Sequence, residues 1–235
     1  MREMCLTCRR STAACLCSQI KSFQTRCRFV LLMHPMEARK ERTGTGRLAH
    51  VCLLNSEIIV GINFNEERRV RELLRDDGFF PMVLYPGEQS INLTESNSAQ
   101  IEQLISEKIP LIFVIDGTWP CAKKMMKSST LLHNLPRLSF SSETKSQFVI
   151  KHQPHALCLS TIESIHTVLT ELVRLKTEQL DGKHDNLLHV FKAMIQFQIR
   201  CAQDPNISSY RPKRDFKDPA QRRPAKKWEK RKLLF

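Results

Sequence analysis

The strongest constraint on the fold is an apolar run that ends abruptly in polar and turn-forming residues. Residues 111–115 are five consecutive large apolar residues, and residues 116–120 read Asp-Gly-Thr-Trp-Pro. Such a run predicts a strand buried on both faces of a sheet, and Pro120 suits the first turn of a following helix. Because open α/β sheets bind ligands beyond the carboxyl ends of their strands, this junction is a candidate site. The alternative is a strand that leaves the core through an ordinary Asp-Gly turn.

Strand-like and amphipathic segments alternate along the rest of the chain. We expect strands at residues 29–33, 58–60, 82–85, 111–115 and 147–150. We expect helices at residues 48–54, 66–77, 98–108, 120–127, 160–179 and 187–202. This order predicts an α/β fold with a mostly parallel sheet flanked by helices.

The overall composition is that of a globular protein with a sizeable core. The chain has 235 residues, of which 41% are hydrophobic and 26% charged. No apolar stretch approaches the roughly 18 residues that span a bilayer, and the N-terminus lacks a signal-type apolar segment. We therefore expect a cytoplasmic protein with no membrane association.

Four cysteines gather near the N-terminus. Cys5 and Cys8 form a C-x2-C pair, and Cys15 and Cys17 form a C-x-C pair. Disulfides are disfavoured in a reducing compartment, whereas two close thiolate pairs can bind one tetrahedral zinc ion. Four thiolates leave no open coordination position, so the sequence predicts a structural zinc site in a small segment of residues 1–27.

The C-terminal residues 205–235 are predicted to be a basic flexible tail. Residues 211–235 contain 11 basic and 3 acidic residues, a net charge of +8 in a chain of +13. Tyr210, Phe216 and Trp228 lie among these charges, although a tail that only improves solubility needs no aromatic residue. Basic groups beside aromatic rings suit the phosphate backbone and exposed bases of a nucleic acid. The candidate RNA contacts here are Arg211, Lys213, Arg214, Arg222, Arg223, Lys226 and Lys227.

Common catalytic motifs are absent from the sequence. It contains no G-x-G-x-x-G, no P-loop, no H-E-x-x-H and no G-x-S-x-G, which argues against the sites that these motifs build. Three loops at strand ends remain as ligand-binding candidates, at residues 85–87, 116–119 and 158–163. The helix start at Ser160 and Thr161 offers free backbone N–H groups to a carboxylate, although a purely structural N-cap is the commoner role.

Several short motifs occur together in one order. After the cysteine pairs come His34-Pro35-x-Glu37, Thr45-Gly46-Arg47-Leu48, Leu84-Tyr85-Pro86-Gly87, Asp116-Gly117-Thr118-Trp119 and Leu159-Ser160-Thr161-Ile162-Glu163. Together they resemble the DTW-domain family, the tRNA-uridine aminocarboxypropyltransferases. The length also resembles the bacterial members that modify the variable-loop uridine 47. One departure is Gly44, where the family commonly has Asn.

The resemblance implies a fold, a cofactor and a reaction. The fold is SPOUT-like, with a knot that holds S-adenosylmethionine, and comprises residues 28–204. The reaction moves the 3-amino-3-carboxypropyl group to N3 of a uridine in tRNA and releases 5′-methylthioadenosine. The implied cofactor-binding residues lie in the strand-end loops and are Leu84, Tyr85, Pro86, Gly87, Gly117, Leu159, Ser160, Thr161 and Glu163.

The chemistry also gives roles to the residues after the central strand. Uridine N3 attacks only after losing its proton, so Asp116 is the candidate general base, with a turn-holding role as its alternative. Thr118 is expected to position the loop or a substrate group. Trp119 is expected to stack on a base, or else to plug the core. Arg39, Arg42 and Arg47 are candidate phosphate contacts, and a solvated charged face explains them equally well.

Two other functions fit parts of the same sequence. A SPOUT-type RNA methyltransferase would use the same cofactor but release S-adenosylhomocysteine. A non-enzymatic zinc-ribbon RNA-binding protein would not bind S-adenosylmethionine, and it would not need a full α/β core. Product analysis and cofactor binding separate these alternatives.

Overall fold

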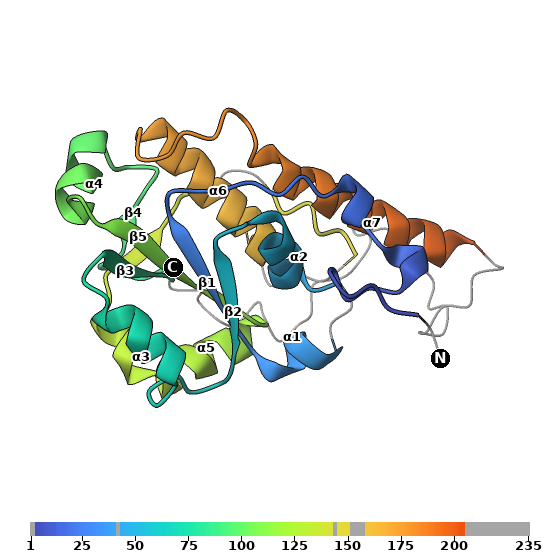
Figure 1. Ribbon diagram of the computed structural model, residues 1–235, viewed down its shortest axis with the longest axis horizontal. Coiled ribbons are helices and arrows are strands. Elements are labelled where there is room, and N and C mark those ends of the chain that lie inside the picture. Colours follow the sequence, from blue (N-terminus) through green and yellow to red (C-terminus); the bar gives the residue numbers. More distant parts are fainter. Residues whose placement is uncertain (1–2, 41–42, 143–144, 151–157, 205–235) are drawn as a thin grey trace.

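The structure is a computed structural model and describes residues 3–40, 43–142, 145–150 and 158–204. Its centre is a six-stranded sheet in the order β2-β1-β5-β3-β6-β4, covered by helices on both faces (Figure 1). The strands are β1 Arg28–Met33, β2 Ser56–Val60, β3 Phe79–Leu84, β4 Ile91–Asn92, β5 Ile109–Asp116 and β6 Arg137–Ser139. All pairings in this sheet are parallel. The predicted α/β fold with a mostly parallel sheet is confirmed.

The apolar run 111–115 forms most of β5, which lies between β1 and β3. Its register pairs Met33 of β1 with Asp116, and Leu84 of β3 with Val114. The carboxyl ends of all three strands therefore lie at one edge of the sheet. Asp116 is the last residue of β5 and therefore lies at the carboxyl end of the central strand.

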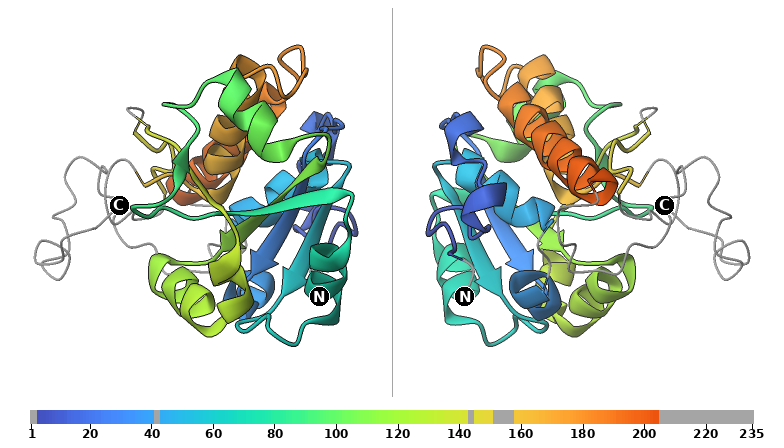
Figure 2. Two further views of the ribbon diagram at one scale, coloured as in Figure 1. Left: turned by 90° about the vertical axis from the view of Figure 1, so that its left-hand side faces the viewer. Right: turned by 90° about the vertical axis from the view of Figure 1, so that its right-hand side faces the viewer.

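The helices divide into two layers. They are α1 Pro35–Lys40, α2 Thr45–Cys52, α3 Arg68–Arg75, α4 Ser98–Ile105, α5 Trp119–Ser128, α6 Thr161–Arg174 and α7 Asp185–Gln203, with 3₁₀ turns at Thr12–Ala14, Cys17–Gln19 and Thr130–Asn134. Buried residues of α2, α4, α6 and α7 pack on one face of the sheet, and those of α3 and α5 pack on the other (Figure 2). Along β5, Ile112 and Val114 face the first layer, whereas Leu111 and Phe113 face the second. Two covered faces explain why the run has no polar alternation.

The prediction of a strand at residues 147–150 is wrong. These residues form a turn in which Val149 N–H donates to the Gln147 carbonyl at 2.8 Å. Phe148 packs edge-on against Phe191 of α7, with ring centroids 5.3 Å apart. This apolar segment therefore packs on α7 and is not part of the sheet. The sheet continues beyond β3 with the short strands β6 and β4 instead.

Helix boundaries differ from expectation near two charged segments. α1 was not expected, and α2 begins at Thr45, whereas the prediction began at residue 48. α6 ends at Arg174, short of the predicted residue 179, and Lys176 has a positive φ of 59°. Just beyond it, the Glu178 carboxylate accepts hydrogen bonds from the backbone N–H groups of Arg26 and Cys27. The chain leaves the helix there to hold the start of β1.

The N-terminal cysteine segment lies against the start and length of α7 (Figure 1). Leu16 is buried in the same core as α7. Asn186 in the first turn of α7 accepts from Lys21 N–H at 2.9 Å and donates to the Gln19 carbonyl at 3.2 Å. The segment is therefore docked on the α/β unit. No helix within the described ranges is long and apolar enough to cross a membrane.

Candidate active site

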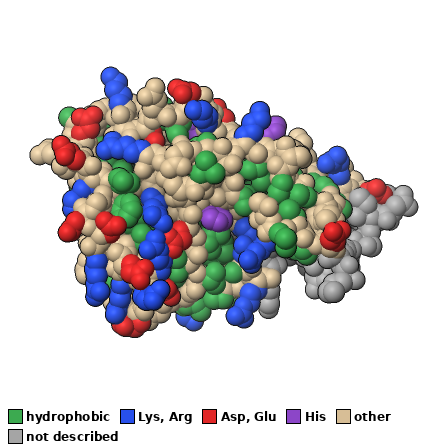
Figure 3. All heavy atoms as spheres, in the orientation of Figure 1, with side chains coloured by type: hydrophobic (Ala, Val, Ile, Leu, Met, Phe, Trp, Pro, Cys, Tyr) green, Lys and Arg blue, Asp and Glu red, His purple; other side chains and the backbone are tan. Residues whose placement is uncertain are grey.

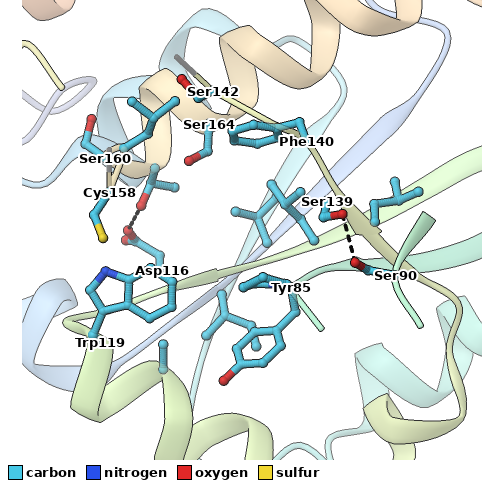
Figure 4. Close-up of a pocket in the computed structure, with 18 of the residues that line it drawn as sticks. Tyr85, Ser90, Asp116, Trp119, Ser139, Phe140, Ser142, Cys158, Ser160 and Ser164 are labelled. Atoms are coloured by element: carbon cyan, nitrogen blue, oxygen red, sulfur yellow. Dashed lines mark hydrogen bonds between the residues drawn. The ribbon is translucent and has the colours of Figure 1, made fainter. Parts of the chain in front are cut away.

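A cavity of about 820 Å³ opens at the carboxyl edge of the sheet. It is lined by the ends of β3, β4, β5 and β6 and by the first residues of α2, α5 and α6 (Figure 4). The three strand-end loops predicted from the sequence, at residues 85–87, 116–119 and 158–163, all contribute to this one cavity. Its volume is in the range of ordinary small-molecule sites.

Asp116 is held in this cavity from two directions. The side chain is 4% exposed, and the Thr161 hydroxyl at the start of α6 donates to Asp116 Oδ1 at 2.6 Å (Figure 4). The first turn of α2 closes on the other oxygen, because a Cβ added to Gly46 would lie 2.3 Å from Asp116 Oδ2. Glycine at position 46 thus leaves the space that the carboxylate occupies.

Arg47 is the predicted phosphate contact that the structure brings near Asp116. Its side chain is half-buried on α2. Burial and the positive charge of Arg9 lower the pKa of Arg47, and the Asp116 carboxylate opposes this shift. Arg39 is exposed at the end of α1, and Arg42 lies outside the described residues.

Aromatic rings surround the middle of the cavity. Trp119 lies beside Asp116, Tyr85 follows β3, and Phe140 follows β6 (Figure 4). The Arg137 guanidinium carbon lies 6.0 Å from the centre of the Tyr85 ring. Burial raises the pKa of Tyr85, and Arg137 partly offsets this. Flat half-buried rings of this kind can stack on a purine or pyrimidine. Thr118 lines the cavity mouth as the exposed N-cap residue of α5.

Side chains that the sequence did not single out also line the cavity. The group of serine hydroxyls comprises Ser90, Ser139, Ser141, Ser142, Ser160 and Ser164, of which only Ser160 had been predicted. Ser90 Oγ donates to Ser139 Oγ at 2.8 Å. Glu37 and Thr45 also line the cavity; both belong to the sequence motifs above, and no role had been assigned to them. Ser90, Ser139, Ser141 and Ser142 carried no sequence signal, because the strands β4 and β6 beside them are very short, and Ser164 lies on α6 outside the motifs.

Glu163, a predicted cofactor contact, lies behind the cavity wall and is not among its lining residues. Its buried carboxylate accepts from the Ser160 N–H at 2.8 Å and the Ser160 hydroxyl at 2.5 Å. It also accepts from the Ser146 hydroxyl at 2.9 Å and the Gln147 N–H at 2.7 Å. This carboxylate fixes the loop before α6 in place. Leu84, Tyr85, Pro86, Gly87, Gly117, Leu159, Ser160 and Thr161 do line the cavity.

The charge of the lining is opposite to the charge of the chain. The lining residues include Glu37, Glu88, Glu95 and Asp116, and no Lys or Arg among the described residues, although the whole chain has a net charge of +13. A cavity rich in carboxylates favours a positively charged ligand.

The four N-terminal cysteines form one cluster. Their sulfur atoms all lie within 4.8 Å of one another, with Cys5 Sγ–Cys17 Sγ at 3.6 Å and Cys8 Sγ–Cys15 Sγ at 3.8 Å. Zinc–sulfur bonds of about 2.3 Å in a tetrahedron place sulfurs about 3.8 Å apart. The backbone N–H groups of Cys8 and Thr7 help lower the pKa of Cys5 to about 6, whereas burial and the neighbouring thiols raise that of Cys17 to about 12. The cluster has the geometry to bind a metal ion.

Fold and site define an α/β protein with a cavity around a buried carboxylate at the carboxyl ends of its parallel strands. The chain matches the DTW domain over residues 2–199 and belongs to that family. The family resemblance drawn from the motifs is thereby confirmed.

Named relatives of this chain occur in animals and plants. The tRNA-uridine aminocarboxypropyltransferase 2 of Mus musculus is 30% identical over 214 residues, which cover 88% of this chain and 67% of the mouse protein. The protein of the same name from Drosophila melanogaster is 30% identical over 177 residues, 73% of this chain and 67% of its own length. The tRNA-uridine aminocarboxypropyltransferase A of Arabidopsis thaliana is 25% identical over 226 residues, 85% of this chain and 82% of its own length. No solved structure matches the chain significantly.

Proposed function

We propose that this protein transfers the 3-amino-3-carboxypropyl group of S-adenosylmethionine to N3 of a uridine in tRNA. The observation that carries the proposal is the Asp116 carboxylate, buried at the cavity wall and held by Thr161 beside Gly46. The names of the relatives support the same activity. The variable-loop uridine 47 is the proposed position, and a SPOUT-related knotted topology is part of the same proposal; both rest on the family resemblance.

The cavity suits S-adenosylmethionine in charge and in the side chains that line it. This molecule carries a sulfonium cation and an ammonium group, and four carboxylates line the cavity. The rings of Tyr85, Trp119 and Phe140 offer apolar faces to adenine and uracil. The serine hydroxyls can bind the ribose and the amino-acid carboxylate.

Asp116 is proposed to act as the general base. Its carboxylate takes the N3 proton of uridine, and the freed N3 electron pair attacks the carbon of the aminocarboxypropyl group bonded to sulfur. An N–C bond forms, the C–S bond breaks with its electron pair going to sulfur, and neutral 5′-methylthioadenosine leaves.

The tRNA is proposed to bind through basic groups outside the cavity. The densest group of Lys and Arg side chains in Figure 3 lies over α3 and β2. Arginines there form ion pairs with glutamates, as Arg69 does with Glu57 and Arg71 with Glu66. Such pairs leave little net charge for a phosphate backbone. The predicted contacts of the tail, residues 211–227, lie outside the described residues and hold a large share of the chain's excess charge.

The four-cysteine cluster is proposed to hold one structural zinc ion. Four thiolate ligands would come from Cys5, Cys8, Cys15 and Cys17, and their sulfur separations support this assignment. A metal there would fix the fold of a segment that has little core of its own.

The decisive experiment is mass spectrometry of tRNA nucleosides and small-molecule products. Purified protein incubated with tRNA and S-adenosylmethionine should yield aminocarboxypropyl-uridine and 5′-methylthioadenosine. S-adenosylhomocysteine with a methylated nucleoside would instead indicate a methyltransferase. The absence of both products, together with no binding of S-adenosylmethionine in calorimetry, would indicate a non-enzymatic RNA-binding protein.

A further inference from the structure

A second group of metal-binding side chains lies at the junction of α6 and α7, away from the cavity. His166 belongs to α6, His184 precedes α7, and Asp185 is the first residue of α7. One possible ligand atom from each of the three lies within 4.8 Å of the others. His166 Nε2 and Asp185 Oδ1 are 2.9 Å apart, and the two imidazole rings are 5.1 Å apart between centroids.

The hydrogen bonding of the buried His184 ring is incomplete among the described residues. The residue is 8% exposed, and its Nδ1 is buried without a hydrogen-bond partner among the described residues. It stands at the N-cap position of α7, yet its side chain makes no capping hydrogen bond. A buried polar atom without a partner is destabilising, so a bound metal ion that completes the bonding of Nδ1 would stabilise the protein.

We propose that His166, His184 and Asp185 form a zinc site that is separate from the cysteine cluster. Two imidazoles and one carboxylate are a common donor set for Zn²⁺ with an open position for water. Ligand atoms about 2.0–2.1 Å from a tetrahedral zinc lie about 3.3 Å apart. The observed separation of 2.9 Å between His166 and Asp185 needs only a few tenths of an ångström to reach that value.

The side chains of the proposed site differ in their exposure to solvent. The side chain of Asp185 is 72% exposed, whereas that of His166 is 17% exposed. The ion would therefore be seated on the two imidazoles and reached by solvent past the carboxylate. Such a site is expected to exchange its metal more readily than four clustered thiolates.

The position of the site points to a clamp between two helices. α6 begins at Thr161, the residue that holds Asp116, and Asn186, next to Asp185, holds the N-terminal segment. A zinc ion between His166 and Asp185 would fix both helices at a point where they are joined by the loop 175–184. It would thus stabilise the frame of the active site without touching the substrate.

Metal stoichiometry tests the proposal. The full-length chain, without a histidine tag, is stripped of metal, dialysed to equilibrium against micromolar Zn²⁺, and analysed for zinc. With the cysteine cluster filled, we expect about two zinc ions per wild-type chain and about one in Asp185→Asn and His184→Gln. The control is His189→Gln, an exposed histidine on the same helix, which should keep two. Loss of zinc in the control, or equal zinc content in wild type and Asp185→Asn, would overturn the proposal.

Asp185→Asn is the more secure variant because its side chain is exposed and the amide oxygen can still accept from His166. Thermal melting provides a second readout: added Zn²⁺ should raise the Tm of the metal-stripped wild type more than that of Asp185→Asn. Substitution with Co²⁺ assigns the remaining ion, since the thiolate charge-transfer band should persist in Asp185→Asn. The same zinc-induced rise in Tm in both proteins would mean that His166 and Asp185 form only an ion pair.

Discussion

The carboxylate of Asp116 combines two properties that a general base needs, since it is held in one orientation and it lines the cavity. Asp116→Asn keeps the size of the side chain and can still accept from Thr161. We expect kcat to fall by about 10²–10⁴-fold, with near-normal binding of S-adenosylmethionine and tRNA. Activity should recover as the pH is raised and uridine loses its N3 proton unaided. A mutant that turns over normally, or loses only cofactor binding, would assign Asp116 to a structural role.

Gly46 makes the position of Asp116 possible, and its substitution tests that geometry. In most helices, Gly→Ala is stabilising by up to about 1 kcal/mol. Here the new Cβ would lie 2.3 Å from Asp116 Oδ2, so the carboxylate has to move. We expect Gly46→Ala to stay folded in thermal melts while kcat falls at least about tenfold, because small displacements of a catalytic group are costly. The control Gly78→Ala meets only the exposed Asp76 side chain, at 3.1 Å, and should keep full activity.

At the scale of single residues, the sequence indicated Asp116 because it directly follows a buried strand, and open α/β sheets bind ligands beyond the carboxyl ends of such strands. It could not indicate the contact of Gly46 with Asp116, since that contact joins residues far apart in the chain across the edge of the sheet. The cavity serines were equally hidden. Serine is common on surfaces, and only the pairing of β3, β6 and β4 brings several of them together.

Among the elements, the start of α6 depends most on one side chain. Glu163 accepts four hydrogen bonds from Ser160, Ser146 and Gln147. Glu163→Gln removes the charge and replaces one accepting oxygen with a donor. We expect the free energy of unfolding to fall by about 1–3 kcal/mol, measured by denaturant titration.

The matched control for this change is Glu72→Gln on α3, where a half-exposed glutamate pairs with Arg68 and Arg69. The control should alter stability by no more than about 0.5 kcal/mol. If Glu163→Gln instead left stability unchanged and abolished the binding of S-adenosylmethionine, then Glu163 would contact the cofactor as the sequence predicted.

Element by element, sequence periodicity performed best where the elements are long and buried. β5 and α7 were recognised within about two residues because their apolar patterns extend over many positions. β4 and β6 have two and three residues, too few to show any period. The wrong prediction of a strand at residues 147–150 has a related cause. A short apolar cluster predicts that its residues are buried but not in which element, and here Phe148 is buried against a helix.

On the scale of the whole molecule, the basic tail should govern affinity for tRNA. Truncation after Asn206 removes the net charge of +8 carried by residues 211–235. Fewer condensed counterions would then be released on binding. We expect a higher KM for tRNA, a flatter dependence of binding on salt, and an unchanged KM for S-adenosylmethionine. An unaltered tRNA affinity would assign the tail to solubility alone.

The cysteine cluster allows a second test at this scale. Cys5→Ser combined with Cys8→Ser should remove the ion from the cluster, because two of four thiolates are lost. Elemental analysis should show about one zinc fewer per chain. The control is Cys201→Ser on α7, which lies outside the cluster and should not alter the metal content. The same zinc content in the double variant would contradict the assignment.

The sequence indicated the cysteine cluster because its members are close along the chain. It did not indicate where the segment docks. Asn186 and Lys21 are 165 residues apart, and no local pattern carries such a contact. The order of the strands was hidden for the same reason, since β5 inserts between β1 and β3 only in three dimensions.

The docking of the N-terminal segment on α7 imposes an order on synthesis. Ribosomes add about 5–20 residues per second, so Asn186 is made about 8–33 s after Lys21, from their separation of 165 residues. The four thiols lie within a span of 13 residues and can gather as soon as they leave the ribosome. The surface that later covers Leu16 does not yet exist at that time. The N-terminal segment therefore cannot dock, and Leu16 stays uncovered, until α7 has been synthesised.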